Sequence, residues 1–156
     1  MKAQRGVFLL EALVAILIFS LGVLGMVAMG AASVSAQSDA QYRTEAANFA
    51  SDIAGEIALR VDRTSPATIQ TTLAPFAHQA TGAGCQFSGA ASVNPTVTDW
   101  VARVNAVRTG LPSAGTNQQI VVNSSAAGFN RVTITLCWQA PADRVQRHHT
   151  LTTFVN

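Results

Sequence analysis

The first part of this 156-residue chain is almost wholly apolar. Between Val7 and Ala32 the only charged residue is Glu11, and the next charge is Asp39. About 20 apolar residues are enough to cross the hydrocarbon core of a membrane as a helix. Helix-forming residues dominate the segment, and no proline occurs before Pro66. The pattern therefore predicts a membrane-spanning segment that continues as one helix to about Arg63.

Beyond Ser38 the pattern predicts that the same helix becomes amphipathic. Apolar residues recur at helical spacing, and charged residues occupy the remaining positions. The apolar face of this half should therefore pack on a sheet formed by the rest of the chain. Its apolar positions are Ala46, Phe49, Ala50, Ile53, Ile57 and Val61.

The middle of the chain predicts short elements. Thr64-Ser65-Pro66 should end the long helix, and the segment from there to about Pro95 is expected to be mostly loop, with a short helix near 68–76. A further helix should begin with its cap within Thr96–Asp99 and stop at Gly110 and Pro112. Its apolar face would comprise Trp100, Val101, Val104 and Val107.

Near the C-terminus the hydrophobic period changes to two. Strict alternation over Arg131–Trp138 places apolar side chains on one face of a strand and threonines mainly on the other. Val145–Val155 alternates in the same way, and Gln118–Asn123 offers a third strand. We therefore expect an α+β fold, in which a long N-terminal helix packs on a C-terminal antiparallel sheet of three or more strands.

The two cysteines, Cys85 and Cys137, lie far beyond the apolar segment. If this part of the chain is exported, an oxidising compartment favours a disulfide between them. On the predicted strand Cys137 points away from the apolar face, so the bond would hold the long loop over the outer side of the sheet. The alternative is two unpaired small core residues.

Charge is sparse and nearly balanced. Only 12% of the residues are charged, against about 25% in typical soluble domains. The formal net charge is +2, and Lys2 and Arg5 account for it, so no field that would steer nucleic acid is expected. These two cations place the N-terminus in the cytoplasm by the positive-inside rule and the following domain outside.

Three interpretations of the apolar segment compete. Val34-Ser35-Ala36 is compatible with a signal-peptide site cut before Gln37, but the apolar stretch is longer than such peptides usually have. A plain membrane anchor has no use for Glu11, because an acidic side chain in the apolar zone costs about 3 kcal/mol. The third interpretation gives the carboxylate a role.

Gly6 followed by Val7-Phe8-Leu9-Leu10-Glu11 resembles the type III signal of type IV pilins and pseudopilins. The resemblance implies that residues 1–6 are a leader, which a prepilin peptidase cleaves between Gly6 and Val7 before it methylates the new terminus at Val7. It implies a transmembrane and assembly helix over 7–38 and a periplasmic pilin-like domain over 39–156, which includes the amphipathic half of the helix. Glu11 would pair with the terminal ammonium of a neighbouring subunit.

Two departures from that family pattern occur. Val7 stands where phenylalanine is usual, and Ala28 stands where many members have a helix-breaking proline. Small residues recur at every fourth position on one side of the expected helix, where another helix could approach closely, although an alanine-rich helix with no packing role explains them equally well. These residues are Ala28, Ala32, Ala36 and Ala40.

A narrower resemblance is to the PilV group of minor pilins, carried by Leu9–Ala15, Gly22–Gly25, the Leu111-Pro112 pair and Trp138. It implies a minor pilin that primes assembly of the pilus and so contributes to twitching motility. Such a subunit moves from the inner membrane to a tip complex at the cell surface with other minor pilins and the major pilin, and an adhesin often joins that complex. The alternatives are an I-type pseudopilin of type II secretion and a DNA-binding minor pilin.

Catalytic and metal-binding patterns are weak. Lys2 is the only lysine, which excludes a phosphate-binding P-loop, and no Gly-x-Ser-x-Gly motif occurs. His148 and His149 are adjacent, so on a strand they would face opposite sides. We expect no enzyme activity, cofactor or metal. A patch for nucleic acid, although not favoured, would be formed by Arg131, Arg144 and Arg147 with one of these histidines.

Overall fold

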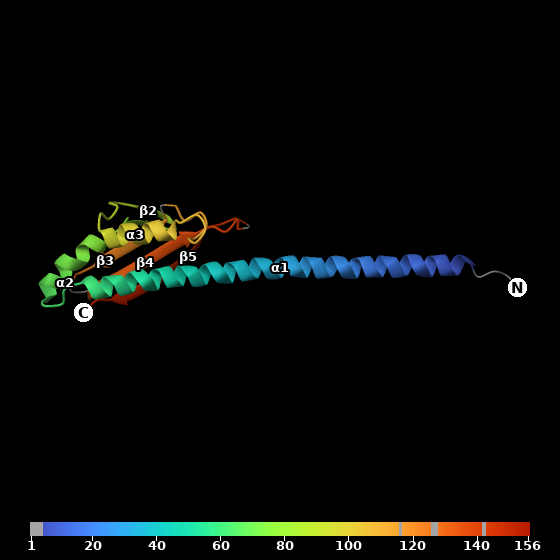
Figure 1. Ribbon diagram of the computed structural model, residues 1–156, viewed down its shortest axis with the longest axis horizontal. Helices are drawn as coiled ribbons and strands as arrows, with labels where there is room; N and C mark the ends of the chain where they lie inside the picture. Colours follow the sequence, from blue (N-terminus) through green and yellow to red (C-terminus); the bar gives the residue numbers. More distant parts are fainter. Residues whose placement is uncertain (1–4, 116, 126–127, 142) are drawn as a thin grey trace. The chain divides into compact units, whose positions relative to one another are not determined.

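The computed structural model describes residues 5–115, 117–125, 128–141 and 143–156. It confirms the α+β fold, in which a long N-terminal helix packs on a C-terminal antiparallel sheet (Figure 1). Helix α1 spans Arg5–Arg60, three residues short of the predicted end. The chain divides into two compact units, Met1–Asp39 and Ala40–Asn156.

The sheet of the second unit has the order β3-β4-β5, with antiparallel pairing throughout. Strand β3 spans Gln118–Asn123, β4 spans Arg131–Trp138 and β5 spans Arg147–Phe154. The predicted bounds of the first two strands are correct, and β5 is slightly shorter than the expected run. Alternate residues of β4 are buried against α1 because the strand period of two places them all on the inner face.

The amphipathic half of α1 supplies one side of the core. Ala46, Ala50, Ile53 and Ile57 are fully buried, and Phe49 packs against the core while remaining partly exposed. These side chains join a single cluster with the inner faces of β3 and β4. The predicted helix-on-sheet packing is confirmed.

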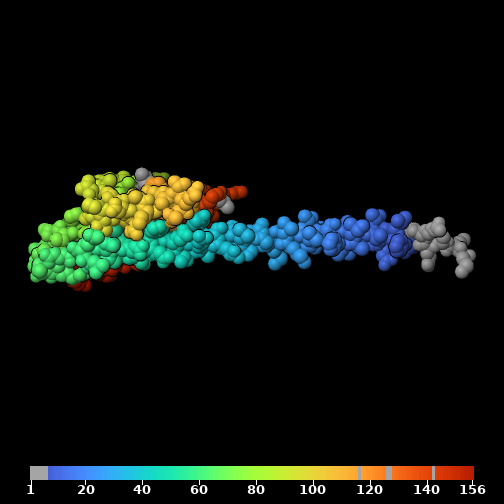
Figure 2. Space-filling model, in the orientation of Figure 1, coloured from blue at the N-terminus to red at the C-terminus, as the bar shows by residue number. Residues whose placement is uncertain are grey.

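Helices α2, Pro66–Leu73, and α3, Pro95–Val104, complete the core together with the 3-10 helix η1, Ala74–Phe76. Figure 2 shows the side chains of α3 lying against the second half of α1. Trp100 links the two helices, since its fully buried indole N–H donates to the carbonyl of Phe49 at 2.8 Å.

Two details of the predicted helix around Trp100 are wrong. Its N-cap is Asn94, whose Oδ1 accepts from the backbone N–H of Thr96 at 3.0 Å. The helix ends at Val104, and Val107 is fully exposed. The chain folds back there because the N–H of Leu111 donates to the carbonyl of Val104 at 2.8 Å, which removes Val107 from the helical face.

A small hairpin lies within the segment expected to be mostly loop. Strands β1, Thr81–Ala83, and β2, Gln86–Ser88, pair antiparallel around Gly84 and Cys85. Both turn residues have positive φ, 61° and 66°, as a two-residue type I′ turn requires. The sequence does not predict this hairpin, because its strands are short and mostly exposed and therefore carry no apolar alternation.

Candidate functional site

The apolar part of α1 is exposed along its length. From Val7 through Gln37 every side chain is exposed except that of Ala12, which is half-buried. By length and composition this helix can cross a membrane, although a signal sequence near the N-terminus meets the same criteria. The segment is therefore compatible with a membrane anchor.

Glu11 lies in this segment and is exposed. No ion pair involving Glu11 is present among the side chains that the structure describes. Val7 is 68% exposed, and both Gly6 and Val7 lie within α1. The carboxylate is therefore carried on a helical surface of apolar side chains, where removal from water without a partner would be unfavourable.

The small residues of α1 form an exposed stripe. Ala28, Ala32, Ala36 and Ala40 are all exposed and follow one another at helical spacing. At Gly22, Gly25 and Gly30 an added Cβ would meet nothing within 4 Å. The stripe has the geometry on which a second helix can approach closely, and nothing in the described part of the chain covers it.

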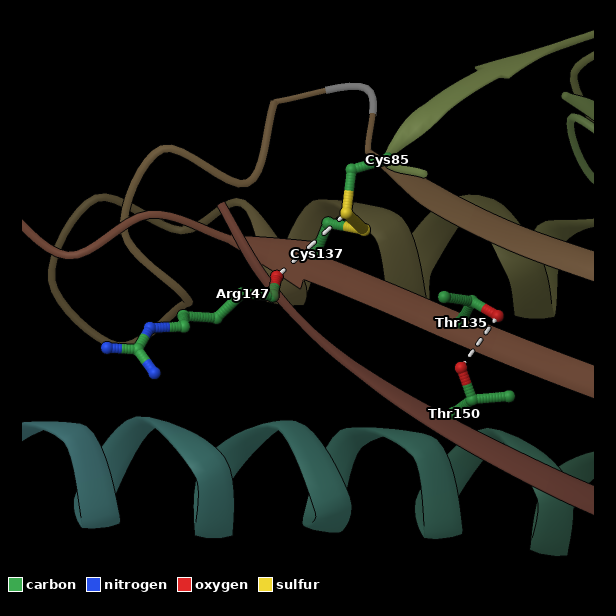
Figure 3. The surroundings of a disulfide bond; sticks show 5 residues. All are labelled: Cys85, Thr135, Cys137, Arg147 and Thr150. Atoms are coloured by element: carbon green, nitrogen blue, oxygen red, sulfur yellow. Dashed lines mark hydrogen bonds between the residues drawn. A yellow bond between two sulfur atoms is a disulfide. The ribbon is translucent and has the colours of Figure 1, made fainter. Parts of the chain in front are cut away.

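A disulfide joins the hairpin to the sheet, as the sequence predicted. Cys85 and Cys137 form a bond of 2.05 Å, and both residues are buried. Cys137 lies on the outer face of β4, away from α1, and Cys85 lies in the β1–β2 turn (Figure 3). Sγ of Cys85 is 4.0 Å from the carbonyl oxygen of Arg147, so the turn sits over the start of β5.

The suggested cluster of arginines does not form. Arg131 pairs with Phe154 and Arg147 pairs with Trp138, at opposite ends of the β4–β5 ladder. Seven residues of extended strand separate the two arginines by roughly 23 Å. Arg147 also donates to both carboxylate oxygens of Asp143, at 3.1 and 3.3 Å. Arg131 is therefore excluded from any patch with Arg144 and Arg147.

The three histidines occupy separate positions. His148 pairs with Cys137 and His149 with Leu136, so they face opposite sides of the sheet as expected. His78 is buried, and its Nδ1 accepts from the backbone N–H of Ser92 at 3.1 Å. Burial lowers the pKa of His78. In the described part of the chain no group of three potential metal ligands comes together.

His78 instead has a structural role, because its backbone pairs with that of Ile120 in β3. Its backbone N–H donates to the carbonyl of Ile120 at 3.0 Å, and the N–H of Ile120 donates back to the carbonyl of His78 at 2.9 Å. This bridge occupies part of the free edge of β3. The sequence does not predict this bridge, because it depends on tertiary pairing that no local pattern carries.

Comparison with known proteins adds no relatives: no protein-family model matches the chain, and neither curated proteins nor solved structures give a significant match.

Proposed function

We propose that this protein is a subunit of a type IV pilus-like filament, inserted in the inner membrane by α1 before assembly. One observation carries the proposal: an exposed apolar helix with a single carboxylate near its start leads into a domain that has its own core. The prepilin-like sequence Gly6 to Glu11 supports it.

In the proposed assembly step, a prepilin peptidase cuts between Gly6 and Val7 and methylates the amine of Val7. Residues 7–38 then move from lipid to the filament core. Glu11 pairs there with the ammonium of a neighbouring subunit, which offsets the cost of burying either charge alone. The small residues of α1 allow the helices of neighbouring subunits to approach closely.

The disulfide supports export of the domain formed by residues 39–156. Such bonds persist in oxidising compartments, of which the bacterial periplasm is one. The domain would stand in the periplasm before assembly and at the pilus tip afterwards. As a minor pilin of the PilV type it would act as a structural subunit, without catalysis, beside other minor pilins, the major pilin and a tip adhesin.

The N-terminus of the mature protein tests the first step. Mass spectrometry of the membrane-bound chain should show a terminus at methylated Val7. A chain that starts at Gln37 would identify a signal peptide, and one that retains Met1 to Gly6 would identify a plain anchor, so either result refutes the pilin proposal.

The pairing of Glu11 has its own test. Glu11→Gln keeps the size of the side chain and removes its charge, so the variant should insert in the membrane and be processed, yet be lost from sheared pili. Ser20→Ala is the matched control, since Ser20 lies in the same segment and its hydroxyl donates to the carbonyl of Ile16 within the same helix. Equal recovery of both variants in pili would contradict the role given to Glu11.

A deletion strain separates the two kinds of filament. Loss of surface pili and twitching with normal protein secretion is expected for a PilV-type subunit. The reverse pattern would assign the chain to the type II secretion system as an I-type pseudopilin.

A further inference from the structure

A small pocket lies between the β1–β2 hairpin and the outer face of the sheet. Its volume is about 230 Å3, and its walls include the disulfide and Phe87 of the hairpin. Thr135 of β4 and Thr150 of β5 line it from the sheet, with their Oγ1 atoms 3.2 Å apart (Figure 3). His148 also lines it, and its exposed side chain, like that of Thr150, makes the pocket reachable from solvent.

The hairpin holds the pocket in a preformed shape. Besides the disulfide, the side chain of Gln119 fixes the hairpin, because its Nε2 donates to the carbonyls of Gln79 at 2.9 Å and Thr81 at 3.1 Å. The hairpin wall includes the small residues Gly82 to Gly84. Gly82 has a φ of 87°, and an added Cβ would collide with the carbonyl oxygen of Gln86. No ordering of a loop is therefore needed before a ligand enters.

The polar groups in the pocket offer both hydrogen-bond donors and acceptors. In the threonine pair one hydroxyl donates to the other, which leaves one hydroxyl hydrogen and several lone pairs for a ligand. The imidazole nitrogens of His148 add further hydrogen-bonding groups. No lysine, arginine, aspartate or glutamate is among the described lining residues.

This chemistry selects among ligand classes. A phosphate or carboxylate would lack the fixed cation that such groups prefer. A wholly apolar ligand would leave the remaining hydroxyl hydrogen of the threonine pair without a partner as it loses water. A neutral ring with hydroxyls at its edge and C–H groups on its face satisfies the threonines, the imidazole and the ring of Phe87 together. The volume lies below the range of about 300–1,000 Å3 for drug-sized ligands, so one ring fits.

We propose that this outer-face pocket binds a single pyranose ring of a neutral glycan. Thr135 and Thr150 bind its hydroxyls, and Phe87 contacts its C–H face. The site lies wholly within the second unit and uses no residue of the apolar helix, so it is independent of the proposed assembly function.

Calorimetric titration of the full-length protein in detergent micelles tests this site. The ligands are the methyl pyranosides of glucose, galactose, mannose and N-acetylglucosamine. At least one sugar should bind saturably, and sorbitol should not. Thr150→Val keeps the shape of the side chain and removes its hydroxyl, so affinity should fall about tenfold. Phe87→Leu should also weaken binding, because the aromatic face is lost.

Thr152→Val is the matched control, because Thr152 lies on the same strand and the same face but outside the pocket. It should bind as the wild type does. Disulfide formation and an unchanged thermal transition in each variant exclude misfolding as the cause. Absence of saturable binding by all four sugars, or equal loss in the Thr150 and Thr152 variants, would overturn the proposal.

Discussion

Reduction of the disulfide should destabilise the domain strongly. Cys85 and Cys137 are 52 positions apart in sequence, so the bond closes a long loop in the unfolded chain. In the chain-entropy model a loop of this length contributes about 4 kcal/mol at 25 °C. For a domain of this size the melting temperature of the reduced protein should fall on the order of 15 °C.

Tryptophan fluorescence is a suitable probe of this loss. The chain has two tryptophans, Trp100 and Trp138, and both are buried in the domain rather than in the apolar helix. Denaturant unfolding in detergent micelles, with and without a reducing agent, should give the difference in the free energy of unfolding. The wild type is preferred to a variant here, because alanine at the buried Cys137 would add a cavity cost of its own.

The double variant Cys85→Ala, Cys137→Ala serves as the control for the reductant, and its stability should not respond to the reducing agent. Alanine at position 85 adds no new backbone strain, because Cys85 already has a φ of 66°. A loss below about 1 kcal/mol in the reduced wild type would show that the loop is already restrained in the unfolded state, and the loop-closure reasoning would fail.

Three further outcomes are expected. Ile53→Ala, at a fully buried position of α1, should lower the free energy of unfolding by about 2–5 kcal/mol, whereas Leu59→Ala on the same helix, 84% exposed, should change it by less than about 0.5 kcal/mol in denaturant unfolding. Trp100→Phe leaves the carbonyl of Phe49 without its 2.8 Å partner and should cost about 1–3 kcal/mol in the same assay. Burial lowers the pKa of His78 below its ordinary value of 6.5, so the unfolded state binds more protons than the folded state. The free energy of unfolding should therefore fall as the pH drops below 6.5 and level off below the folded-state pKa. His78→Gln should remove that part of the pH dependence in unfolding measured from about pH 8 to 4.

Much of the fold could be predicted because its elements carry strong local patterns. The alternation from Arg131 to Trp138 has an apolar face that must be buried, and this fixes both the strand and its orientation. The same alternation placed Cys137 on the outer face, from which a bond across the outside of the sheet followed. The amphipathic half of α1 could be predicted for the same reason, since a period of 3.6 identifies its buried face.

The errors occurred where a contact distant in sequence decides the conformation. The helix around Trp100 ends early because Leu111 bonds back to Val104, and a valine at helical spacing such as Val107 gives no sign of that. The hairpin at Gly84 and Cys85 depends on its link to β4 rather than on an apolar face of its own. The suggested arginine cluster does not form because β4 and β5 are long enough to hold Arg131 and Arg147 at opposite ends of their ladder.

The position of the core bears directly on the proposed function. Among the described residues, the core and the side chains packed against it begin at Tyr42 of α1. The exposed apolar side chains from Val7 to Val34 are therefore not needed to complete the domain, and none of the described residues covers them. Lipid can cover leucine, isoleucine and phenylalanine, but it offers no partner for the carboxylate of Glu11. In the proposed filament, a second subunit with a free amine near its own N-terminus would cover the apolar side chains and also pair with the carboxylate. Cleavage at Gly6 and the charge of Glu11 must therefore be tested together.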